Sequence, residues 1–97
     1  MNNTVDNDVI KYLIKKFEEK IRNNPLSPEF VKLANYYIVD GNINEAVNVL
    51  KLGLYFYPHY LTAKLLLGKC HLANRYFYDA KTLFEEILAE YPELAIA

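Results

Sequence analysis

The chain has 97 residues, of which 53% are hydrophobic and 24% charged, and its 11 Lys and Arg against 12 Asp and Glu give a net charge of -1. This composition excludes a disordered chain, and the near-neutral charge argues against nucleic acid as a partner. The chain shows no secretory signal and no apolar run near the roughly 18 residues of a membrane span, and its single cysteine agrees with a reducing compartment. We therefore expect one small cytoplasmic domain that does not insert into a membrane.

The first predicted element is an amphipathic helix over residues 8–24. Residues 1–7 precede it and are predicted to form a disordered tail. The helix is predicted to end at Asn23-Asn24-Pro25, because proline cannot continue a helix. Its apolar face consists of Val9, Ile10, Leu13, Ile14, Phe17 and Ile21.

Two units of 34 residues follow, 27–60 and 61–94. When the chain is shifted by 34 places, large residues align with large ones, small with small, and proline with proline. A fixed period of this length is the signature of a repeat architecture. Residues 95–97 are predicted to form a short C-terminal tail. The aligned pairs include Leu33 with Leu67, Ala34 with Gly68, Ala46 with Ala80, Leu54 with Leu88, Tyr57 with Tyr91 and Pro58 with Pro92.

Each unit is predicted to be a helix, a turn and a second helix. In the first unit, apolar residues recur at i, i+3, i+4 and i+7 on both sides of a polar break. Ser27 before Pro28 is a typical helix start, since serine caps the first turn and proline is tolerated at its first position. Gly41 can adopt the left-handed conformation that ends a helix, and Pro58 stops the second helix.

The second unit repeats this plan with a less favourable turn. Arg75 stands where the first unit has Gly41. A non-glycine residue in the left-handed conformation costs about 1–2 kcal/mol, so Asn74 is expected to adopt it instead.

The order of small, large and proline residues in both units resembles the tetratricopeptide repeat. The resemblance implies an all-α fold of antiparallel helix-turn-helix repeats, an α-solenoid of about five helices in a short right-handed stack. The N-terminal helix would cap the start of that stack. The signature places 4, 7, 8, 11, 20, 24, 27 and 32 are filled by Phe30, Leu33, Ala34, Tyr37, Ala46, Leu50, Gly53 and Pro58, then by Lys64, Leu67, Gly68, His71, Ala80, Phe84, Ile87 and Pro92.

The second unit departs from this pattern at three places. Lys64 replaces a large aromatic residue, His71 replaces a tyrosine, and Ile87 replaces the small residue that admits a following repeat. Because no third repeat follows, the last helix is predicted to expose an apolar face. Either a second copy covers this face in a homo-oligomer, or the chain is the N-terminal piece of a longer repeat protein. The predicted face comprises Phe84, Ile87, Leu88 and Tyr91.

The resemblance also implies that the first helix of each unit lines a concave groove for a protein or peptide partner, as in a scaffold or adaptor. A groove this apolar could equally be core or dimer surface. One form of the family clamps a C-terminal carboxylate, but Val31 and Leu66 occupy two of the three clamp places, so we expect no clamp here. The predicted groove residues are Val31, Asn35, Ile38, Leu65, Lys69 and Leu72.

No residue pattern supports catalysis. Cys70 and His71 are adjacent, and neighbouring helical residues point about 100° apart, so they do not face each other as nucleophile and base. Two histidines and one cysteine match no zinc spacing. The nine Tyr and five Phe lack a positive groove for single-stranded nucleic acid, so we assign them to core and interface. We therefore predict an interaction module without catalytic, cofactor or metal residues; the alternative is a self-association module.

Overall fold

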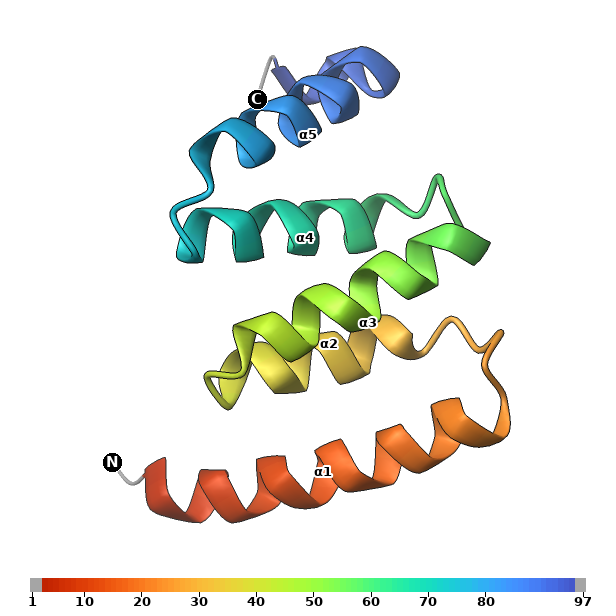
Figure 1. Ribbon diagram of the computed structural model, residues 1–97, viewed down its shortest axis with the longest axis vertical. Helices are drawn as coiled ribbons and strands as arrows, with labels where there is room; N and C mark the ends of the chain where they lie inside the picture. Colours follow the sequence, from red (N-terminus) through yellow and green to blue (C-terminus); the bar gives the residue numbers. More distant parts are fainter. Residues whose placement is uncertain (1–2, 96–97) are drawn as a thin grey trace.

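The computed structural model describes residues 3–95, and it is helical with no strand in that range. The helices follow one another through a stack in which α1 and α5 lie at opposite ends (Figure 1). Helix α2 packs on α1 and α3, α4 packs on α3 and α5, and α2 also contacts α4. The all-α prediction is confirmed; the α-solenoid arrangement and its right-handed sense stay predictions. The elements are α1 (Asn3–Asn23), α2 (Phe30–Val39), α3 (Ile43–Phe56), α4 (Leu61–Ala73), α5 (Phe77–Glu90) and the 3-10 helix η1 (Pro92–Ala95).

The N-terminal helix is longer than the sequence pattern indicates. It begins at Asn3 instead of Asp8, so the backbone of residues 3–7 is helical where we predicted a tail. Once a helix is nucleated, each added residue gains a hydrogen bond at little further cost, which accounts for this extension. At the other end of the chain Ala95 closes η1. The remaining tail residues, 1–2 and 96–97, lie outside the described range.

The prediction that Ser27 caps the helix is wrong, because the residue before α2 is Glu29, which makes no side-chain cap bond; Ser27 instead closes the turn that precedes the helix. The Ser27 Oγ accepts a hydrogen bond from the Glu29 N–H at 3.2 Å, and the regular helix begins only at Phe30. The Ser27 N–H donates to the Asn24 carbonyl at 3.0 Å, as the N–H of Tyr60 does to Tyr57 at 3.1 Å after α3. Helix α1 therefore ends in the same way as α3.

The turns inside the two units have the same backbone geometry. After α2, the Asn42 N–H donates to the Tyr37 carbonyl at 2.8 Å. After α4, the Tyr76 N–H donates to the His71 carbonyl, also at 2.8 Å. Together with the neighbouring bonds from residues 41 and 75, this is the Schellman motif, which satisfies the last carbonyls of a helix. The 34-residue period is therefore a structural repeat as well as a sequence repeat.

The left-handed residue in the second turn is Arg75, so the expectation for Asn74 is wrong. Arg75 has φ 63° and Gly41 has φ 84°, whereas Asn74 has φ -86°. The Schellman bonds fix which position must be left-handed, and Arg75 occupies it. The second unit therefore carries backbone strain that the first unit avoids.

Replacing Arg75 with glycine is expected to raise the free energy of unfolding by about 1 kcal/mol, because glycine adopts positive φ without steric cost. Urea unfolding followed by circular dichroism measures the change. The reverse substitution, Gly41→Arg, has open space for a side chain and should lose a similar amount through φ alone. Unchanged stability in both variants would contradict the assigned strain.

The core of the first unit is built on a large residue facing a small one. A Cβ added to Gly53 of α3 would overlap the ring of Phe30 on α2. The Phe30 ring is buried and also meets Tyr57 and Tyr60, with centroids 6.2 and 5.7 Å away. Only glycine leaves room for this contact, which draws α2 and α3 together.

The second unit has an unbranched lysine in place of the aromatic ring and a larger isoleucine in place of the glycine. Lys64 stands in the place of Phe30, and Ile87 in the place of Gly53. The Lys64 side chain is 12% exposed, and its ammonium reaches Glu90 at 2.9 Å. Hydrogen bonds from Lys64 and from His59 hold the pKa of Glu90 below its ordinary value. Ile87 is only 2% exposed, so it belongs to the core.

Candidate functional site

Most of the exposed residues of α2 and α4 lie in one stripe on each helix. Their spacing of i, i+3 and i+7 places them on a single helix face. Because α2 contacts α4, the two stripes belong to neighbouring helices, and we name them together the α2–α4 face. Its members are Lys32, Asn35 and Val39 from α2, and Thr62, Leu65, Lys69 and Leu72 from α4.

Two hollows lie along this face. The first hollow, of about 200 Å³, lies between α2, α3 and α4. The second hollow, of about 440 Å³, lies between α4 and α5. Leu66 and Lys69 line both. The first hollow is completed by Asn35, Ile38, Ile43, Cys70 and Ala73, and the second by Thr62, Leu65 and Phe84.

The structure brings some of the predicted groove residues together and separates others. Asn35, Ile38 and Lys69 line the first hollow, while Leu65 joins Lys69 at the second. Leu72 is exposed beside the hollows without lining either of them, and Val31 is half-buried at the edge of the core.

The predicted groove did not include Ile43, Leu66, Cys70 or Phe84, which also line the hollows. Phe84 reaches the second hollow because Gly68 leaves space for its ring, since a Cβ there would come within 2.5 Å of it. The pairing of Gly68 with a large residue one helix later was the available signal.

The charges of the α2–α4 face have one sign. Lys32 and Lys69 are exposed, and neither has an ion-pair partner among the side chains described for residues 7–95. No carboxylate lines either hollow. The face therefore combines apolar hollows with uncompensated positive charge.

Cys70 and His71 lie in different environments. Cys70 lines the first hollow, and burial raises the pKa of its thiol, which keeps it in the unreactive protonated form. His71 lines another cleft with Lys51 and Asp79. The Nδ1 atom of His71 is buried, and it has no hydrogen-bond partner among the described residues. The Tyr76 ring lies nearby, with its centroid 6.4 Å from that of the imidazole. The two side chains thus line different clefts.

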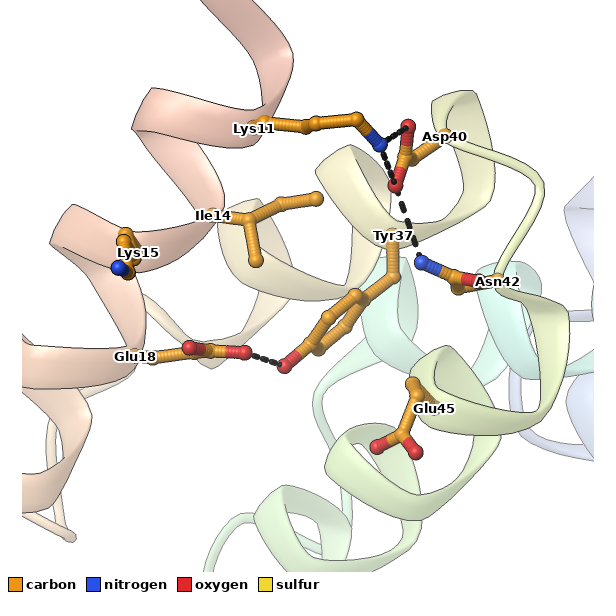
Figure 2. A pocket seen from close by; sticks show the side chains of 8 residues that line it. All are labelled: Lys11, Ile14, Lys15, Glu18, Tyr37, Asp40, Asn42 and Glu45. Carbon is orange, nitrogen blue, oxygen red and sulfur yellow. Dashed lines mark hydrogen bonds and ion pairs between the residues drawn. The ribbon is translucent and has the colours of Figure 1, made fainter.

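A larger cleft, of about 680 Å³, lies between α1, α2 and α3. Figure 2 shows Lys11 pointing at Asp40, with Nζ 3.3 Å from Oδ1, and Glu18 meeting the Tyr37 hydroxyl. Burial, followed by the hydrogen bond to Glu18, raises the pKa of Tyr37, so its hydroxyl donates to the carboxylate. These groups satisfy one another and fasten α1 to α2. The sequence did not indicate these contacts, because packing alone sets the register between α1 and α2.

The predicted face on the last helix is largely covered by the chain itself. Ile87 is buried against the rest of the chain, so its assignment to an exposed face is wrong. Phe84 and Tyr91 are half-buried, and Leu88 is 39% exposed. The residue equivalent to Ile87 in the first unit, Gly53, lies against the Phe30 ring. The second unit has Lys64 in the place of that ring.

A different apolar stripe is exposed on α3. Leu52, Tyr55 and Phe56 are 59%, 79% and 41% exposed, and their i, i+3 and i+4 spacing puts them on one face. The rings of Tyr55 and Phe56 meet edge to face at 5.2 Å. The equivalent places in the second unit hold Glu86, Ala89 and Glu90. The stripe is therefore a feature of the first unit alone.

Within the described part of the chain, no three or more His, Cys, Asp or Glu side chains lie close enough together to hold a metal ion. None of the helices in that part has both the length and the apolar character needed to cross a bilayer.

Comparison with protein-family models, curated proteins and solved structures finds no match to this chain. The tetratricopeptide resemblance therefore rests on the chain's own residues and on the equivalent geometry of its two units. Membership of that family stays a prediction.

Proposed function

We propose that the chain is a protein-interaction module of the tetratricopeptide type, which binds a segment of another protein along the α2–α4 face. The observation that supports this is the first hollow, where Asn35 and Ile38 of one unit meet Lys69 of the next. Apolar surface with a few polar groups is the usual composition of a peptide-binding groove. On this proposal the chain recruits a partner as a scaffold or adaptor and carries out no chemistry itself.

The pairing of polar side chains favours the α2–α4 face as the binding site over the cleft between α1, α2 and α3. In that cleft Lys11 already pairs with Asp40, and the Tyr37 hydroxyl already donates to Glu18. A ligand there would have to replace these bonds. On the α2–α4 face, by contrast, a partner gains new contacts with Lys69 without breaking an internal ion pair.

Self-association is a second candidate function, which the exposed stripe of α3 favours. Leu52, Tyr55 and Phe56 present aromatic and aliphatic surface of the kind enriched at interfaces. This surface differs from the face on α5 that the sequence pattern indicated.

Two matched substitutions separate the candidates. Peptides selected from a random library against the wild-type protein should bind the Leu65→Glu variant about tenfold more weakly or worse, because the charge enters an apolar hollow. The Leu52→Glu variant should bind those peptides normally, since α3 is not part of the face. Fluorescence anisotropy measures binding, and analytical ultracentrifugation measures association in both variants.

Equal binding to the wild-type and Leu65→Glu proteins, with both variants folded by circular dichroism, would refute the assigned face. Concentration-dependent association that Leu52→Glu abolishes would support the second candidate.

A further inference from the structure

Lys69 occupies a central position on the α2–α4 face. Its side chain helps to line the first hollow and the second hollow, and Leu66 is the only other residue in both. The two are three residues apart on α4, so they form one ridge with an apolar hollow on either side. A segment that crosses this ridge meets apolar surface, then a lysine, then apolar surface.

The positive charge at this ridge has no ion-pair partner among the side chains that the structure describes. Four other lysines pair with carboxylates at 2.9–3.6 Å, namely Lys11, Lys20, Lys64 and Lys81. Lys69 has no such partner within the described side chains, and Lys32 of the adjacent α2 stripe adds a second unpaired cation. Although the whole chain has a net charge of -1, this face is locally positive.

The polar neighbours of Lys69 suit a carboxylate. Asn35 lies across the first hollow, and its amide can donate a hydrogen bond to an acceptor placed there. Charge-assisted hydrogen bonds to a carboxylate are stronger than those between neutral groups. The hollows differ in size, about 200 and 440 Å³, so the first suits an aliphatic side chain and the second, with the Phe84 ring in its wall, suits an aromatic one.

We propose that the segment bound at the α2–α4 face carries an acidic side chain between two apolar side chains, with the carboxylate on Lys69 and the apolar side chains in the two hollows. This inference rests on the proposed function. The carboxylate belongs to a residue inside the segment, so the binding differs from capture of a chain terminus.

A charge exchange tests this arrangement. Random peptides with amidated C-termini are selected against the wild-type protein, and we expect enrichment of sequences with Asp or Glu flanked on both sides by apolar residues. Replacing that acid by Gln in the best peptide should weaken binding about three- to tenfold. The Lys69→Glu protein should bind the acidic peptide about tenfold more weakly, and a peptide with Lys in place of the acid should restore part of the loss.

Lys16→Glu is the matched control. Lys16 is exposed on α1 and the substitution changes net charge equally, so it should leave the affinity within about twofold once long-range charge is screened at 0.15 M salt.

The outcomes distinguish this inference from the proposed function. Enriched peptides that are purely apolar or basic, and that bind the Lys69→Glu protein as well as wild type, would refute the acidic segment and leave the interaction module standing. Absence of any enriched peptide would refute both. Tighter binding of single-stranded DNA than of the acidic peptide, lost in Lys69→Glu, would assign the same charge to nucleic acid and overturn the inference.

Discussion

Replacing Ile87 with alanine is expected to lower the free energy of unfolding by about 2–5 kcal/mol, because the substitution leaves a cavity in the core. Ile87 is 2% exposed and stands among the largest fully buried side chains in the described range. Thermal or urea unfolding measures the loss. In a chain of this size each kcal/mol shifts the melting temperature by roughly 4–8 °C.

Two variants make this expectation specific. Ile87→Val removes one methylene, should cost about 0.5–1.5 kcal/mol, and stays measurable if the alanine variant does not fold. Leu88→Ala removes a neighbouring side chain that is 39% exposed and should cost clearly less than Ile87→Ala. Equal losses at residues 87 and 88 would mean that Ile87 is not a core residue.

Gly53→Ala is expected to destabilise the chain by about 2 kcal/mol. The added methyl group would overlap the Phe30 ring, which is itself held by Tyr57 and Tyr60 and cannot move aside. An overlap this severe belongs at the upper end of the roughly 1–3 kcal/mol that overpacking costs. After the gain of about 1 kcal/mol that alanine brings to a helix interior, a net loss of about 2 kcal/mol remains. Urea unfolding with tyrosine fluorescence follows the change.

Gly68→Ala is the matched control for this prediction. Its methyl group would also meet an aromatic ring, but Phe84 is half-buried and lines the open second hollow, so the ring has room to shift. We expect a change within about 1 kcal/mol, since helix propensity offsets the remaining clash. A larger loss at Gly68 than at Gly53 would contradict the difference in freedom between the two rings.

The helices and the period were predictable because local rules determine them. Apolar spacing located the helices, Gly41 marked an end, and the 34-residue shift placed the second turn, whereas Ser27 lies three residues before the start of α2. The burial of Ile87 was not predictable from place 27 alone, because burial depends on how the other helices pack against α5. The bond between Tyr37 and Glu18 depends on how α1 lies against α2, and no local pattern encodes that register.

The candidate site was predictable in part for the same reason. Helical spacing identified the exposed stripes that include Asn35, Leu65 and Lys69. The hollows between helices depend on crossing angles and on ring positions, and so the contribution of Phe84 appeared only in the structure.

The two units place different residue pairs at the same positions, and this bears on how their sequences can diverge. Phe30 and Gly53 both lie in the first unit, and Lys64 and Ile87 both lie in the second. Because both members of each pair lie inside one unit, we expect one pair to replace the other without a compensating substitution in the neighbouring unit. The shared turn geometry would keep the two units in register through such a change.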